Sequence, residues 1–187
     1  MAAKKKSSKK ITSKKRPPPK RKTAARKAKS KPKNASAAPE STNTVSPMLT
    51  FKDAGAAVAF YKAAFGAKEL YRLCEPSGKI GHVEMMIGNS LIMMGEEYPD
   101  MALYAPDHYE GVPLRMNIVV KDADRAFQRA IAAGATATRD VKTQFYGWRS
   151  GNLTDPFGYH WMVSAEVEKI SPKVMQKRWN KMFEQGN

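Results

Sequence analysis

The sequence predicts an α+β fold made of two tandem βαβββ modules, preceded by a basic tail and followed by a C-terminal helix. One observation is a repeat: FKDAGAAVAFYKAAFGA, which starts at Phe51, aligns with VKDADRAFQRAIAAGA, which starts at Val120, with one gap. Strand patterns surround both stretches in the same order, and a repeat of this size indicates two copies of one supersecondary unit. A second observation is the segment QFYGWRSGNLTDPFGYHW at 144–161, where two extended runs flank the turn sequence DPFG.

The first module begins with a strand expected at 46–51, in which Leu49 and Phe51 share the apolar face. Asp53 has the position of an N-cap for the helix that follows, and Gly66 has the position that ends it. Three more strands are expected, at 68–73, 80–87 and 91–94.

The second module repeats this order after an irregular bridge at 95–113. Asp122 is expected to cap its helix, which ends at Gly134. Arg149 and Asp155 are expected to tie the hairpin arm to its turn. The strands of this module are expected at 114–120, 135–141, 148–154 and 159–164.

Three regions follow from these patterns. Residues 1–44 form a Lys/Arg-rich tail, residues 45–170 form the globular domain, and residues 171–187 form a last helix. The modules occupy about 45–95 and about 114–168. Trp179, on the apolar stripe of the last helix, is expected to dock on the domain or on a second subunit; membrane-surface binding is the alternative.

The tail carries almost all of the net charge. Residues 1–45 hold 16 of the 33 Lys and Arg residues and one of the 17 acidic residues, so they carry +15 and the rest of the chain +1. Such a segment is predicted to be disordered. It resembles nuclear localisation signals and histone-like tails, and a flexible polycation of this kind contacts nucleic acid by releasing counterions; a tail that only solubilises is the alternative. The residues that would act are Lys14, Lys15, Arg16, Lys20, Arg21, Lys22, Arg26 and Lys27.

Other features of the sequence indicate the cellular compartment. A single cysteine, Cys74, excludes an intramolecular disulfide and indicates a reducing compartment. No run approaches the roughly 18 apolar residues of a membrane span, and the N-terminus lacks the apolar core of a secretory signal. We therefore expect no membrane partner, with a cytoplasmic or nucleoid location in a bacterium and a nuclear one in a eukaryote.

The duplicated unit, the helix pattern KDAGAAVAFYKAAFGA, the strand GHVEMMIGNSLIMM and the segment at 144–161 together resemble the vicinal oxygen chelate superfamily, and within it the PhnB-like branch. The resemblance covers about residues 45–170 and implies that the modules form a barrel-like cleft, usually in a homodimer. It also implies a divalent metal in the enzymes of the family. The positions that would supply the ligands hold Ser46, Arg115, Met162 and either Ile92 or Met93, and none of these is a normal ligand of such a metal. We therefore expect no metal and no other cofactor.

The cleft lining follows from the polar faces of the strands, because helices are expected to cover the apolar faces. His82 and Glu84 are the candidate catalytic pair, with an ordinary hydrogen-bonded pair or an unorthodox metal site as alternatives. Arg115 is expected to pair with an anionic ligand or with an internal acid such as Glu84. The predicted ligand-binding residues are Met48, Thr50, His82, Glu84, Arg115, Asn117, Tyr146, Trp148, His160 and Met162.

Three functions are compatible with these patterns. The first is a metal-independent homodimer that binds a small, partly apolar ligand in its cleft, as in bleomycin-resistance-like sequestration. The second is a glyoxalase-like lyase or isomerase that uses His82 and Glu84. The third is a chromatin- or nucleoid-associated dimer whose tail binds DNA. Whether the chain is an enzyme stays open at this point.

Overall fold

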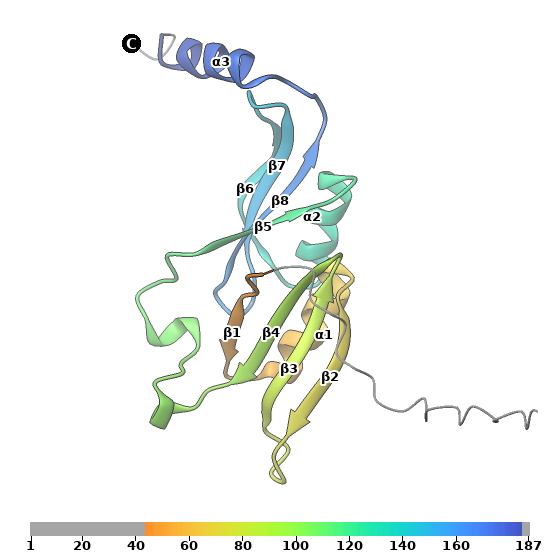
Figure 1. The fold of residues 1–187 in the computed structure, drawn as a ribbon, viewed down its shortest axis with the longest axis vertical. Coiled ribbons are helices and arrows are strands. Elements are labelled where there is room, and N and C mark those ends of the chain that lie inside the picture. Colours follow the sequence, from red (N-terminus) through yellow and green to blue (C-terminus); the bar gives the residue numbers. More distant parts are fainter. Residues whose placement is uncertain (1–43, 185–187) are drawn as a thin grey trace, which may run out of the picture. The chain divides into compact units, whose positions relative to one another are not determined.

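The computed structural model describes residues 44–184, and the predicted tail lies outside this range except for Thr44. The described chain contains two modules with the strand and helix order that the repeat predicts (Figure 1). The elements are β1 (Met48–Phe51), α1 (Ala54–Phe65), β2 (Lys68–Cys74), β3 (Ile80–Ile87), β4 (Ser90–Glu96), β5 (Arg115–Val119), α2 (Ala123–Ala132), β6 (Thr136–Thr143), β7 (Trp148–Thr154), β8 (His160–Glu166) and α3 (Pro172–Glu184).

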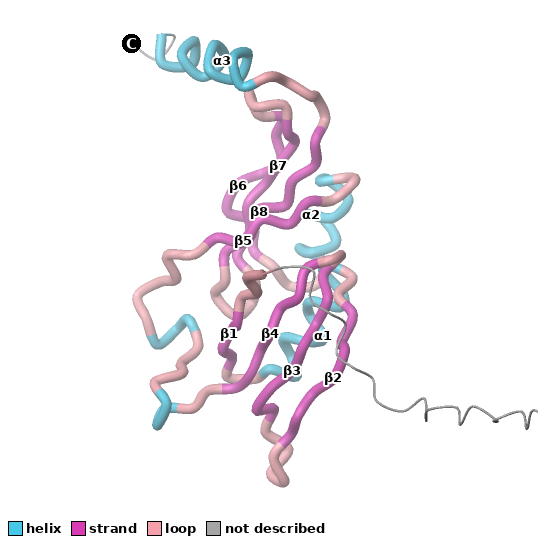
Figure 2. The backbone as a smooth tube through the Cα atoms, viewed as in Figure 1, coloured by secondary structure: helices cyan, strands magenta, loops and turns pink. Residues whose placement is uncertain are grey.

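Each module forms its own four-stranded sheet, in the orders β1-β4-β3-β2 and β5-β8-β7-β6. In both sheets the first strand runs parallel to the last strand of the module, and the remaining neighbours are antiparallel. Met48 therefore lies opposite Met93, and Arg115 lies opposite His160. The bridge between the modules is mostly loop, with short 3-10 turns at Pro99–Met101 and Pro106–His108 (Figure 2). The predicted duplication is confirmed.

The helix starts follow from their caps. The Asp53 carboxylate accepts a hydrogen bond from the Ala56 amide at 2.8 Å, and Asp122 accepts one from the Arg125 amide at 3.0 Å. Gly66 ends α1 in the left-handed region at φ 67°, where glycine has no steric penalty. Within residues 44–184, no helix combines the length and the apolar character needed to cross a membrane.

Two strands of the second module run further than the apolar pattern predicts. β6 continues to Thr143 and β8 continues to Glu166. Their ends pair with β7, since Thr143 lies opposite Arg149 and Trp148 lies opposite Glu166. Backbone pairing with a neighbouring strand prolongs these strands beyond the residues that reach the core.

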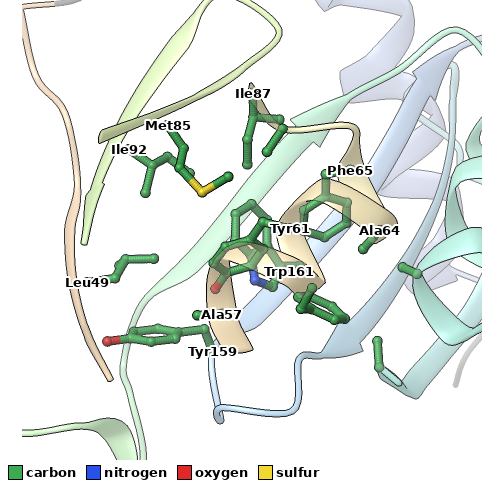
Figure 3. Packing of buried hydrophobic residues seen from close by; sticks show 14 of the residues in the cluster. Leu49, Ala57, Tyr61, Ala64, Phe65, Met85, Ile87, Ile92, Tyr159 and Trp161 are labelled. Atoms are coloured by element: carbon green, nitrogen blue, oxygen red, sulfur yellow. The ribbon is translucent and has the colours of Figure 1, made fainter. Parts of the chain in front are cut away.

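The core lies between the helices and the sheets, and α1 and α2 also pack against each other. Trp161 of β8 is 3% exposed and contacts Phe65 of α1 with ring centroids 4.7 Å apart. Figure 3 shows Trp161 grouped with Tyr61 and Phe65. The last strand of the second module therefore packs on the helix of the first, which joins the two modules into one core.

The turn after β7 places a carboxylate inside this core. Asp155 is 4% exposed, and its Oδ2 accepts hydrogen bonds from the Tyr61 hydroxyl at 2.6 Å and from Trp161 Nε1 at 3.0 Å. Its Oδ1 accepts from the backbone amides of Phe157 and Tyr159 at 3.0 and 2.9 Å. Burial raises the pKa of Asp155, and these hydrogen bonds oppose the rise.

The prediction that Arg149 and Asp155 tie the hairpin arm to its turn is wrong for Arg149, whereas Asp155 does hold the turn through the amides of Phe157 and Tyr159. Arg149 instead pairs with Asp124 of α2, with Nη2 and Oδ1 2.6 Å apart. Arg149 lies on the face of β7 that meets α2, whereas Asp155 reaches Tyr61, 94 residues earlier in the chain. Neither partner can be found from the local sequence.

Candidate functional site

Each sheet has one face packed against helices and one face left open. In β3, Val83 and Met85 are buried at 0% and 1% exposure, while their alternating neighbours His82 and Glu84 are only partly buried. In β7, a Cβ atom added to Gly151 would lie 2.9 Å from the Phe127 ring, so this residue faces α2. Because side chains alternate along a strand, the neighbours of these residues point to the open faces.

The open face of the first sheet brings His82 and Glu84 together, as the two-residue spacing predicts. His82 Nε2 lies 3.4 Å from Glu84 Oε1. The Tyr71 hydroxyl of β2 donates to the same Oε1 at 2.8 Å, and this hydrogen bond raises the pKa of Tyr71. A carboxylate that touches both an imidazole and a phenol can orient the imidazole or exchange a proton with it.

Apolar side chains surround this group. Met48 of β1 lies opposite Met93 of β4, and Met93 lies opposite Glu84. Met48 is 52% exposed and Leu73 of β2 is 60% exposed. The face therefore offers one partly buried polar group within an uncovered apolar surface.

The open face of the second sheet is polar and cationic. Arg115 lies beside His160, whose Nδ1 is 3.0 Å from the Thr154 hydroxyl. Asn117 accepts a hydrogen bond from the Ser164 hydroxyl at 2.8 Å. Arg115 forms no ion pair with any residue in the described range, so the predicted pairing with Glu84 is not present within one chain.

The remaining predicted residues divide between the two faces. Met162 lies beside Asn117 on the second sheet, and Thr50 lies on the open side of β1, where its amide and carbonyl bond the Tyr159 hydroxyl. Trp148 is the first residue of β7 and Tyr146 lies in the turn just before it, with the Tyr146 hydroxyl 3.1 Å from Ser150 Oγ. Between residues 44 and 184, no hydrogen bond joins the predicted ligand-binding side chains of one sheet to those of the other. The predicted set therefore forms two half-sites.

Two pockets border these half-sites. One, of about 600 Å³, lies between the bridge and the turn after β7, and His160 is part of its wall. The other, of about 500 Å³, lies between β4 and β5 and is mostly apolar, with Asn117 among its few polar residues. Apolar pockets with a few polar groups are the usual form of small-molecule sites.

Comparison with known proteins identifies the fold family. A family model described as "Glyoxalase/Bleomycin resistance protein/Dioxygenase superfamily" matches residues 44–163. The chain belongs to this superfamily.

Relatives of this superfamily member come from several organisms. An uncharacterized protein of Mycobacterium bovis, Mb0911c, is 36% identical over 135 residues, which cover 71% of this chain and 89% of that protein. A glyoxalase/bleomycin resistance protein/dioxygenase family enzyme from Burkholderia phytofirmans PsJN is 25% identical, with a TM-score of 0.55 and coverage of 65% and 98%. The fosfomycin resistance protein FosX from Listeria monocytogenes is 18% identical, with a TM-score of 0.52 and coverage of 72% and 98%, and shares the fold.

The side chains of this glyoxalase-superfamily chain do not fit the divalent metal that the family implies. Met93 and Met162 point to the open faces at two of the expected ligand positions, and Arg115 occupies a third. Thioether sulfur and a guanidinium are poor ligands for hard divalent ions. Within residues 44–184, no three His, Cys, Asp or Glu side chains cluster closely enough to hold a metal ion.

Several residues on the open faces were missed by sequence reasoning. Tyr71 lies on β2, Arg139 lies on β6, and Ser150 and Asn152 lie on β7. The predicted lining used only the first, third, fifth and last strands, plus Tyr146 and Trp148. Alternation along β7 predicts that Ser150 and Asn152 share the face of Trp148, but the bulges in β2 and β6 break the alternation there.

Proposed function

We propose that the chain is a metal-independent binding protein that holds a small, partly apolar ligand in a cleft completed by a second copy. The observation that carries this proposal is the pair of open half-sites, one on each sheet. Both faces expose large apolar side chains, with Leu73 60% exposed on the first and Val119 61% exposed on the second. Apolar surface of this kind is stabilised by burial against a partner or a ligand.

The opposite charges on the two sheets favour a second copy of the chain as this partner. Glu84 gives the first sheet an acidic group, and Arg115 gives the second sheet a basic group without an ion pair in the described chain. A two-fold dimer can bring the first sheet of one copy against the second sheet of the other, twice. The apolar residues of α3 add contact area for a partner. The Trp179 ring packs on Phe145, with ring centroids 5.0 Å apart, and Trp179 still remains 44% exposed.

The ligand class follows from the side chains of the two faces. Met48, Met93 and Met162 offer flexible apolar contacts that adapt to ligand shape. Arg115 offers a charge-assisted hydrogen bond to an anionic group. We infer a small ligand with an apolar body and an anionic group, held by sequestration in the manner of a bleomycin-resistance protein.

The dimer is the first test. Full-length protein is expected to elute as a dimer in size-exclusion chromatography with light scattering across the micromolar range. Val119→Asp should shift it toward monomer, because a carboxylate on the open face of β5 is costly to bury. Val167→Asp is the matched control, since Val167 is also exposed, at 54%, but lies beyond the end of β8. A wild-type chain that stays monomeric refutes this part of the proposal.

A glyoxalase-like lyase or isomerase is the second candidate, and the contact between His82 and Glu84 is the observation that favours it. In such an enzyme this pair would exchange a proton with the substrate, and Tyr71 would orient Glu84.

Metal content tests whether the protein is metal-independent. We expect no stoichiometric divalent ion after purification without a metal-binding tag, measured by plasma mass spectrometry, because the family's ligand positions hold no suitable donors. Stoichiometric nickel, zinc, manganese or iron that is lost in His82→Ala would overturn the binding-protein proposal in favour of the enzyme. Lys68→Ala, on the exposed end of β2, is the control for a change at the surface.

We also propose that the tail contacts nucleic acid, which would place the protein at a nucleoid or in a nucleus. The support is the charge of residues 1–45, which lie almost wholly outside the described range. In a chromatin- or nucleoid-associated dimer, the folded part would bring two tails together.

A further inference from the structure

Arg139 of β6 contacts neutral polar side chains on the second sheet. Its Nη2 atom donates to Ser150 Oγ and to Asn152 Oδ1, both at 3.3 Å. Ser150 is fully buried and Asn152 is 9% exposed, whereas Arg139 itself is exposed. The guanidinium is therefore oriented by acceptors that do not neutralise its charge.

The other nitrogen atoms of this guanidinium are available to a ligand. Nε and Nη1 of Arg139 make no hydrogen bond to any residue of the described chain, and no carboxylate there pairs with it. The carboxylates to consider are Asp140, the next residue of β6, and Glu166, which lies opposite Trp148 at the end of β8. Neither forms an ion pair with Arg139.

A second donor lies beside the guanidinium. The Tyr146 hydroxyl is 3.1 Å from Ser150 Oγ, which also accepts from Arg139. When Ser150 donates its proton to Tyr146, the phenolic proton of Tyr146 is free to point away from the sheet. Lys142, which pairs with Ser150 across the ladder, adds positive charge to this region.

We propose that Arg139 and Tyr146 form a subsite for an oxyanion, either a carboxylate or a phosphate group. A guanidinium fixed by neutral acceptors, with donors still unused, matches the planar oxygen pairs of such groups. The inference rests on the proposed function, since it gives the ligand a second anionic anchor on the sheet that carries Arg115. Arg115 and Arg139 lie on opposite edge strands of this sheet, so a ligand that reaches both spans the sheet.

Titration of full-length protein with inorganic phosphate tests the subsite. Binding is followed by phosphorus-31 NMR and by the melting temperature, in sodium chloride at matched ionic strength. Arg139→Gln is expected to weaken the site by about tenfold, and Tyr146→Phe by a smaller factor. Arg139→Lys should recover only part of the affinity, because an ammonium keeps the charge but lacks the fork of donors. The same series with acetate distinguishes a carboxylate site from a phosphate site.

Arg125→Gln is the matched control. It removes the same charge from the exposed surface of α2 and leaves the tail unchanged, so non-specific phosphate binding by the tail is the same in both variants. If Arg139→Gln and Arg125→Gln bind both anions as tightly as the wild type, the subsite does not exist. This outcome is independent of the dimer, because a monomer with an intact second sheet would still show the loss in Arg139→Gln.

Discussion

Asp155→Asn is expected to lower the free energy of unfolding by about 3 kcal/mol or more, the range for a buried charged acceptor whose partners are left unpaired. The Asp155 side chain is the acceptor in all four of its hydrogen bonds, and the donors are two backbone amides, the Tyr61 hydroxyl and Trp161 Nε1. A carboxylate can accept all of them. An asparagine has one oxygen and one NH₂ group. Its NH₂ group would therefore face N–H or O–H donors and could not accept their hydrogen bonds.

Denaturant unfolding of matched variants checks this prediction. Tyr61→Phe removes one donor and leaves the carboxylate in place, so it should cost about 1 to 3 kcal/mol. Asp124→Asn is the control, because Asp124 is exposed and solvent screening leaves its pair with Arg149 little effect on stability. The double variant Asp155→Asn with Tyr61→Phe should cost less than the sum of the single changes. Equal effects of Asp155→Asn and Asp124→Asn would show that the buried carboxylate is not a structural centre.

Deleting residues 1–44 is expected to abolish binding to duplex DNA. Residues 46–187 carry a formal net charge of only +1, whereas the tail carries +15. If the tail neutralises about six phosphates, the slope of log K against log salt should be roughly −5. The melting temperature should change little, because the sequence from residue 12 to residue 44 has no aliphatic side chain larger than alanine to contribute to a core.

Gel-shift titrations at several salt concentrations measure this effect. Full-length Arg115→Gln is the control, since Arg115 belongs to the open face of the second sheet and its loss should leave DNA affinity unchanged. If the shortened chain binds DNA as tightly as the full chain, the folded part carries the binding, and the proposed division of roles is wrong.

The sequence by itself determined the order of helices and strands, because helix caps and apolar periodicity are local features of the chain. Asp53 and Asp122 mark two helix starts, Gly66 marks a helix end, and the apolar pattern of strands such as β3 shows which face reaches the core. The contact between His82 and Glu84 was also predictable, since it depends only on a spacing of two residues within one strand.

Only the tertiary structure decided which distant residues meet. The Asp155 carboxylate accepts a hydrogen bond from Tyr61, in the helix of the other module, and Arg149 pairs with Asp124 of α2. The predicted ligand-binding residues fall on two separate sheets, and the bulges of β6 place Arg139 over Ser150 and Asn152. The physical reason is that periodicity reports which side of an element is apolar, whereas the packing of helices and the pairing of strands select the partner that each polar group reaches.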